Sequence, residues 1–152
     1  GAQMPRAKVW AVIDAPVERG WAIIDQCKDY KRTMVRVLES EELKREGKIV
    51  TCRTQIDMPW PIDDLEAITR ATHTIEAGKR YQRAWTLVSG GYRRNDGSWT
   101  LTPWGDKPGR TLAAYVVLAE PKISVPTWIL KKAARSTLPD LLTNLRLVSA
   151  GK

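Results

Sequence analysis

The side chains that most often carry out chemistry are scarce in this 152-residue sequence, which has a single histidine, His73, and two cysteines, Cys27 and Cys52. Several histidine ligands cannot meet at one metal, and two thiols with one imidazole make a poor zinc site. The cysteines lack the spacing of a redox motif, and free cysteines are usually buried, so we expect both to be reduced core residues. A disulfide between them would instead indicate an oxidising compartment. We predict no metal and no other cofactor.

His73 lies between Ala71 and Ile75 in a stretch whose alternate residues are apolar, which places it on the inner face of a strand. The simplest interpretation is a core histidine that is hydrogen-bonded to a neighbour. A second interpretation is a polar contact for a hydroxyl or carbonyl group of a ligand. A role as general base is disfavoured, because no nucleophile or partner pattern accompanies the histidine. We predict no catalytic residue.

The aromatic composition is skewed towards large side chains with a polar atom, since the chain has seven tryptophans, four tyrosines and no phenylalanine. Trp85, Trp99 and Tyr115 fall on neighbouring predicted strands, where they could fill a core or form the walls of an apolar pocket with a donor for a ligand. We favour the pocket. Arg83 shares the parity of Trp85, and a charge at that position would be costly unless it is paired or solvated.

Two further tryptophans, Trp60 and Trp128, flank predicted turns, and Trp128 is followed by Lys131 and Lys132. A tryptophan at a turn commonly caps the core, and lysines on one side of a helix are commonly a solvated face. An indole beside basic residues is also suited to a membrane interface with anionic headgroups. These four residues are the candidate portal or membrane contact, while a solvated surface is the simpler interpretation.

The net charge of +8 favours an anionic partner. Nucleic acid is disfavoured, because the basic residues are scattered among acidic ones and no nucleic-acid motif is present. The length and the 43% hydrophobic content predict one globular domain over residues 8–149, with tails at residues 1–7 and 150–152. The sequence shows no signal peptide and no membrane span, so a soluble cytoplasmic monomer is the default. A periplasmic location would follow if Ala2-Gln3 is a processed N-terminus.

Period-two patterns and turn residues predict a strand, two short helices, about six antiparallel strands and a final helix. The first strand covers residues 8–14, and Pro16 opens a helix that ends near Ile24. The second short helix covers residues 28–34. The later strands are expected at residues 35–40, 49–58, 65–77, 81–88, 98–104 and 111–119, with residues 95–97 read as a turn. Residues 111–119 are expected to be buried on both faces.

The final helix should begin near Pro126, run for about twenty residues and be kinked at Pro139. It is the element long enough to cover the apolar face of a single antiparallel sheet. The predicted fold is therefore α+β, a curved antiparallel sheet of about six to seven strands wrapped round a long C-terminal helix. Small inward residues such as Ala67 and Ala71 leave volume between sheet and helix, so we expect an open cavity there.

Four segments, in the right order along nearly the whole chain, resemble START-like lipid-binding domains of the helix-grip (Bet v 1-like, polyketide cyclase/dehydrase) superfamily, as found in bacteria. They are residues 9–21, the Pro-Trp-Pro at 59–61 with two aspartates after it, the Gly-Ser-Trp strand at 97–101, and the closing helix at 137–146. Gly20 departs from the apolar residue usual in the family.

The resemblance implies a pocket between the sheet and the last helix for a hydrophobic ligand, such as a sterol or an acyl lipid, and transfer of that ligand at an anionic membrane surface. One alternative is a cyclase or dehydratase that uses the same pocket, and another is a module that grips a macromolecule. The residues expected to bind the ligand are His73, Trp85, Trp99, Tyr115, Cys52, Thr54, Ile56, Met58, Thr69, Ala71, Leu101, Ala134 and Leu138.

Overall fold

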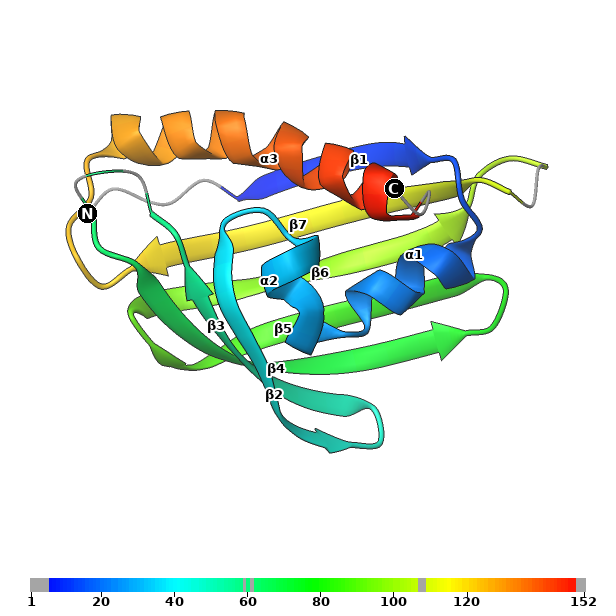
Figure 1. Cartoon of the computed structure of the whole chain (residues 1–152), viewed down its shortest axis with the longest axis horizontal. Coiled ribbons are helices and arrows are strands. Elements are labelled where there is room, and N and C mark those ends of the chain that lie inside the picture. The colour runs from blue at the N-terminus through cyan, green and yellow to red at the C-terminus, as the bar shows by residue number, and fades with distance from the viewer. Residues whose placement is uncertain (1–5, 59, 61, 107–108, 150–152) are drawn as a thin grey trace.

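The computed structural model describes residues 6–58, 60, 62–106 and 109–149, and it has one layer of strands with helices on one face (Figure 1). The strands are β1 (Ala7–Ile13), β2 (Val37–Glu46), β3 (Ile49–Ile56), β4 (Leu65–Glu76), β5 (Arg80–Gly90), β6 (Tyr92–Pro103) and β7 (Thr111–Pro121). The helices are α1 (Val17–Ile24), the 3-10 turn η1 (Cys27–Asp29), α2 (Tyr30–Thr33) and α3 (Thr127–Ser149), which contains Pro139.

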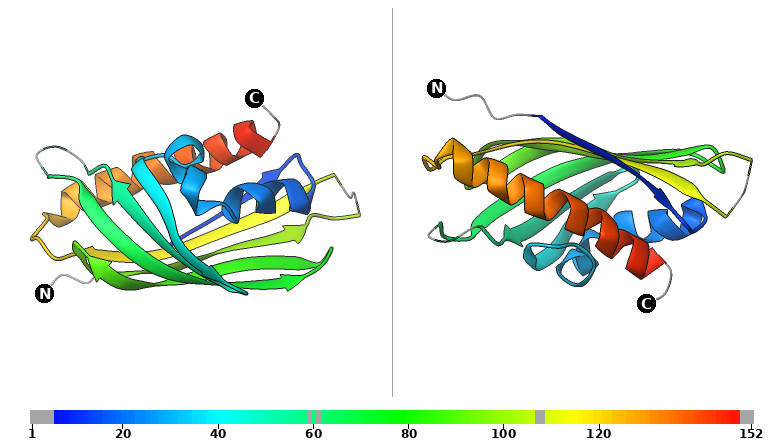
Figure 2. Two further views of the ribbon diagram at one scale, coloured as in Figure 1. Left: turned by 60° about the horizontal axis from the view of Figure 1, so that its bottom comes forward. Right: turned by 90° about the horizontal axis from the view of Figure 1, so that it is seen from above.

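In the described part of the chain the strands form one sheet in the order β1-β7-β6-β5-β4-β3-β2, with every neighbouring pair antiparallel. Register shifts interrupt three of the ladders, between β2 and β3, β4 and β5, and β6 and β7. Such bulges bend and twist a sheet. The sheet is accordingly curved, and its concave face carries α3 and the short helices (Figure 2). The predicted α+β class and curved antiparallel sheet are confirmed.

The short helices form where the apolar spacing predicts them. Pro16 precedes the first residue of α1, where its missing N–H leaves no hydrogen bond unmade. Val17, Trp21 and Ile24 are buried on one side of the helix, at spacings of four and three. Gly20 is buried with them, and a Cβ there would lie 3.3 Å from the Leu101 side chain. The departure from the family pattern therefore lets α1 pack closely on β6.

The solid part of the core fills one end of the molecule. Ile13, Trp21, Leu101 and Leu145 belong to one buried cluster that joins β1, α1, β6 and the last turns of α3. Leu101 and Leu145 are fully buried. Burial of this kind stabilises the fold by about 25 cal/mol per Å² of apolar surface. This packing fixes the position of the helices over the sheet. It does not fill the whole of the concave face.

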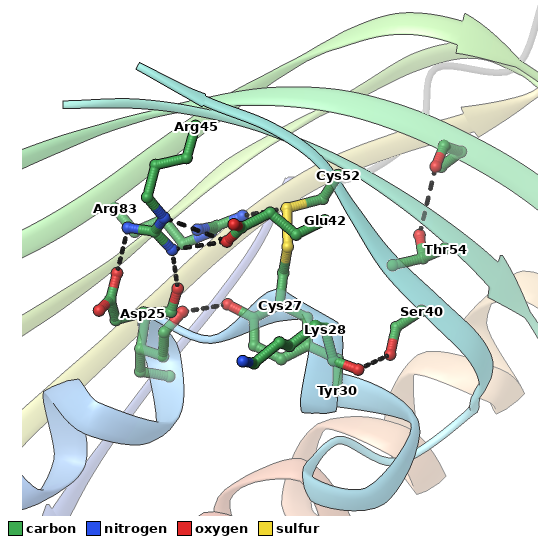
Figure 3. The surroundings of a disulfide bond; sticks show 12 residues. Asp25, Cys27, Lys28, Tyr30, Ser40, Glu42, Arg45, Cys52, Thr54 and Arg83 are labelled. Atoms are coloured by element: carbon green, nitrogen blue, oxygen red, sulfur yellow. Dashed lines mark hydrogen bonds and ion pairs between the residues drawn. A yellow bond between two sulfur atoms is a disulfide. The ribbon is translucent and has the colours of Figure 1, made fainter. Parts of the chain in front are cut away.

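The prediction that both cysteines are reduced is wrong. Cys27 of η1 and Cys52 of β3 form a disulfide, and both are almost fully buried (Figure 3). Their burial was expected, but their pairing depends on how η1 folds back onto β3 rather than on their spacing in the sequence. The bond ties the short helical segment to the sheet.

The predicted turn at residues 95–97 is also wrong, because these residues lie inside β6. Gly97 pairs with Trp85 and Val117. A Cβ on Gly97 would lie 2.2 Å from the Val116 carbonyl oxygen and 2.6 Å from the Trp85 ring. A glycine within a strand often marks such a close approach rather than a turn.

Burial of two predicted strands is less complete than expected. Residues 114–120 of β7 are half-buried, and Trp10 on the neighbouring β1 is 56% exposed. The helices all lie on the concave face, so the other face of this strand stays partly accessible. Ile75, placed on the inner face, is likewise exposed near the end of β4.

Candidate ligand-binding cavity

A cavity of about 320 Å³ lies over the concave face and borders the packed cluster, because Met34, Trp99 and Leu141 belong to both. This volume is within the range of small-molecule pockets. Eight residues predicted to bind a ligand line it: Cys52, Thr54, Ile56, Met58, Thr69, Trp85, Trp99 and Tyr115. Their contact with a ligand stays a prediction. The predicted set does not include the other described lining residues, which are Ala7, Tyr30, Met34, Val35, Arg36, Val37, Asp57, Arg83, Tyr92, Asn95, Val117, Ala119 and Leu141.

The remaining predicted ligand-binding residues lie elsewhere. Ala71 and Leu101 are fully buried and are not among the described lining residues. Their side chains were assigned inward correctly, but inward positions near the packed end belong to the core. The side chains of Ala134 and Leu138 lie outside the described part of the structure. His73 is considered with its neighbours below.

The residues that line the cavity are spread along the strands. On β6 its lining extends from Tyr92 at the start of the strand to Trp99, seven residues later. At the rise of an extended strand this separation is about 20 Å. A volume of this size distributed over such a length suits a chain-like or narrow ligand better than a compact one.

Aromatic rings form one wall of the cavity. The Tyr115 ring lies 4.7 Å from that of Trp99 and 6.0 Å from that of Trp85, centroid to centroid. The indole N–H of Trp85 donates to the side-chain oxygen of Asn95 at 3.1 Å, so this donor is already used within the protein. These contacts hold the rings as a fixed apolar surface.

Two tyrosine hydroxyls in the lining are neutral, and burial makes them still harder to ionise. Desolvation raises the pKa of Tyr92 to about 12 and also raises the pKa of Tyr115. Among the described residues neither hydroxyl has a hydrogen-bond partner. Both are therefore free to donate to, or accept from, a polar group of a ligand.

A polar group closes the inner end of the cavity. Arg83 of β5 lines the cavity and is 3% exposed, and its Nη1 lies 2.8 Å from Nε2 of His73 on β4. An arginine only donates, so Nε2 accepts and the imidazole proton resides on Nδ1. Nδ1 faces the carboxylate of Asp25 at 3.4 Å. Burial and the charge of Arg83 lower the pKa of His73 to about 4, so the imidazole is neutral at pH 7.

His73 is thus a buried histidine bonded to its neighbours, the simplest of the three interpretations of the sequence. It lies behind Arg83 and is not among the described lining residues. The residue that reaches the cavity is Arg83, whose inward parity was visible in the sequence. A buried charge at this position is costly unless it is paired or solvated, and the neutral groups that Arg83 contacts come from other segments.

The opposite end of the cavity is formed by segments with exposed charged residues. Arg36 and Asp57 both line the cavity, and their side chains form an ion pair at 3.2 Å. The Asp57 N–H also donates to the Arg36 carbonyl at 2.8 Å. Both side chains are 41% exposed, which places the mouth of the cavity here.

The candidate portal residues are exposed. Trp60 is 90% exposed and Trp128 is 67% exposed. Trp128, Lys131 and Lys132 border a shallow surface depression on α3 together with Arg135. The connection between β3 and β4 and the first turn of α3 lie at the same end of the molecule in all three views (Figures 1 and 2). The tryptophans therefore project from segments near the mouth.

The sequence of the chain matches a known protein family over most of its length. The family described as polyketide cyclase / dehydrase and lipid transport matches residues 13–146. The chain belongs to this family. The match covers every strand except β1, the described cavity lining except Ala7, and most of α3, so the resemblance seen in the sequence is confirmed.

Solved structures share the fold at low sequence identity. A START superfamily protein from Mycobacterium smegmatis is 19% identical with a TM-score of 0.78, over 96% of this chain and 97% of that one. A STAR-related lipid transfer protein from Xanthomonas axonopodis is 18% identical with a TM-score of 0.84, over 99% of this chain and 88% of that one. The Zhui aromatase/cyclase from Streptomyces sp. R1128 is 11% identical with a TM-score of 0.77, over 97% and 94%.

No curated protein matches the sequence of this chain. Within the described residues, no helix has the length and apolarity needed to cross a membrane. The same residues contain no cluster of three or more histidine, cysteine or acidic side chains that could hold a metal ion.

Proposed function

We propose that this domain binds a hydrophobic ligand, an acyl lipid or a molecule of similar narrow shape, in the cavity and carries it between membranes. The observation that supports binding most strongly is the cavity of about 320 Å³ with an aromatic and aliphatic lining. Burial of apolar ligand surface at about 25 cal/mol per Å², less the cost of association, would supply the affinity. The match to a family that includes lipid transport and the fold shared with a STAR-related lipid transfer protein agree with this proposal.

The binding step is tested with N-phenylnaphthylamine, an uncharged probe that fluoresces when it enters an apolar site. Val117 lines the cavity, whereas Val116 precedes it in β7 and is not among the described lining residues. We expect saturable binding to the protein and to Val116→Trp, and loss of binding in Val117→Trp. Equal binding to both variants, with circular dichroism unchanged, would contradict the cavity as the site.

Delivery to a membrane would use the mouth end of the molecule. The face of α3 that includes Trp128, Lys131 and Lys132 combines an exposed indole with positive charge. Each basic residue near an anionic surface contributes about 1 kcal/mol to binding. We expect sedimentation with phosphatidylglycerol vesicles but not with phosphatidylcholine vesicles.

A charge-matched comparison isolates this face. Lys131→Glu with Lys132→Glu should abolish sedimentation with the anionic vesicles. Lys48→Glu with Lys79→Glu makes the same change in net charge at the exposed hairpin turns and should retain it. Equal loss in both double variants would mean that net charge, rather than this surface, governs the attraction.

The cyclase alternative receives less support from the cavity. An enzyme of that class needs an acid or a base beside the substrate. Among the described lining residues the carboxylate is that of Asp57, which is paired with Arg36 at the mouth, and the hydroxyls of Tyr92 and Tyr115 are proton donors whose pKa values are raised by burial.

The disulfide between Cys27 and Cys52 supports a location in an oxidising compartment.

A further inference from the structure

The inner end of the cavity contains a positive charge with no direct anionic partner. Among the described residues no carboxylate lies within 4.0 Å of the Arg83 guanidinium, although this side chain is 3% exposed. Burying a cation without a counter-ion is costly. A charged side chain at such a position therefore calls for a partner that is absent from the protein itself.

The groups that Arg83 does contact are neutral. One Nη atom donates to His73 Nε2 at 2.8 Å, and the other donates to the Cys52 sulfur at 3.3 Å. The guanidinium carbon lies 5.6 Å from the centroid of the Tyr30 ring. A guanidinium has five N–H donors in a planar fork, so these contacts leave donors available. A disulfide sulfur is also a weak acceptor that a better one can outcompete.

The carboxylates of Asp25 and Glu42, on the far side of His73, are paired with a different arginine. Arg45 bonds to Asp25 at 3.0 Å and to Glu42 at 2.7 Å (Figure 3). Asp25 reaches Arg83 only through the intervening imidazole of His73, which is neutral. This arrangement balances charge at longer range and holds the guanidinium in place, and it leaves the cavity side of Arg83 without a direct ion pair.

We propose that the cavity selects amphiphiles with one carboxylate head, and that Arg83 binds this carboxylate at the inner end. This inference rests on the proposed binding of a hydrophobic ligand. The head enters first and lies beside Trp99, which pairs with Arg83, and the tail runs back past Trp85 towards the mouth. A planar carboxylate matches the guanidinium fork, and such charge-assisted bonds are about twice as strong as neutral ones. A hydroxyl or an ester carbonyl offers neither the charge nor the second oxygen in the same geometry.

Dodecanoic acid, its methyl ester and dodecanol share a tail and differ in the head, so they separate the two proposals. Each is titrated against bound N-phenylnaphthylamine at pH 7.5. We expect the acid to bind tighter than the ester and the alcohol by on the order of tenfold to a hundredfold. Equal affinity of the three compounds would overturn the carboxylate inference and leave the proposed function standing. Failure of the naphthylamine itself to bind would instead remove the proposed function and this inference together.

Two arginine variants test which residue binds the carboxylate. Arg83→Met keeps the bulk of the side chain and removes its charge, and Arg36→Met does the same for the other arginine of the described lining. We expect Arg83→Met to bind acid and ester equally, and Arg36→Met to retain the preference for the acid. A preference that survives Arg83→Met, or that disappears in Arg36→Met, would overturn the assignment. If Arg83→Met does not fold, Arg83→Lys restores the charge without the fork and should show a preference that is reduced but not lost.

Discussion

The neutral imidazole of His73 predicts how stability depends on pH. Its pKa is about 4 in the folded protein, because it is buried and faces the Arg83 guanidinium. An unfolded histidine has its ordinary pKa near 6.5. Between these values the unfolded chain takes up a proton that the folded chain does not. The stability contributed by the neutral imidazole is therefore lost as the pH falls from about 6.5 towards 4.

The magnitude follows from the two pKa values. Linkage predicts a loss of about 2 kcal/mol between pH 7 and pH 4.5 from this residue. Carboxylates also titrate in this range, so the effect is measured as a difference between proteins. Urea unfolding of the wild type and of His73→Gln at both pH values gives this difference, and the variant should lose about 2 kcal/mol less on acidification.

The chain has one histidine, so its imidazole proton resonances are unambiguous and report the folded pKa directly. We expect a titration midpoint near 4 that moves upward in Arg83→Met, because one of the causes of the shift is removed. A midpoint near 6.5 in the wild type, or the same pH dependence in the wild type and His73→Gln, would refute the arrangement of His73 behind Arg83.

Two structural predictions accompany this one. Thiol titration of the denatured protein should find no free thiol, and full reactivity of two thiols in freshly purified protein would contradict the pairing. The double variant Cys27→Ser with Cys52→Ser should lower the free energy of unfolding by about 3 kcal/mol, since the bond closes a loop with a sequence separation of 25. Gly97→Ala should destabilise by about 1–3 kcal/mol and weaken probe binding, because the new Cβ would lie 2.2 Å from the Val116 carbonyl oxygen. Gly109→Ala, which meets nothing within 4 Å, should be neutral in thermal unfolding, and equal effects of the two glycine changes would argue against the close packing of β6.

Much of the fold could be predicted because the apolar residues repeat at the spacing of the elements they form. The alternation of Val50, Cys52 and Thr54 assigns one face of β3 to the interior, and this face lines the core and the cavity. The spacing of Val17 and Trp21 likewise predicts the buried side of α1. Parity assigns a residue to a face of the sheet, and it does so here along most of the chain.

Parity does not tell which part of an inner face is packed and which part is hollow. Ala71 and Thr69 share a face of β4, but Thr69 lines the cavity and Ala71 is fully buried. The difference depends on which helix lies above each residue, and that is set by tertiary packing. Lining residues such as Tyr30 and Met34, which belong to and follow α2, were missed for the same reason.

Local composition also misled at two places. Asn-Asp-Gly is typical of a turn, yet Gly97 is needed in β6 because the Trp85 ring and the β7 backbone approach it. The disulfide was missed because no spacing rule applies to two cysteines that are brought together by the path of η1 across β3. Arg83 had the correct parity, but its contacts come from three other segments, β4, β3 and α2, which parity does not bring together.

Native mass spectrometry of the protein purified from its own host, without added lipid, tests the central claim most directly. We predict a one-to-one adduct that organic solvent removes, that is recovered as a hydrophobic compound, and that is missing from Val117→Trp produced in the same cells. The bare mass of the chain in both proteins, unchanged after incubation with the host's total lipid extract, would contradict the account.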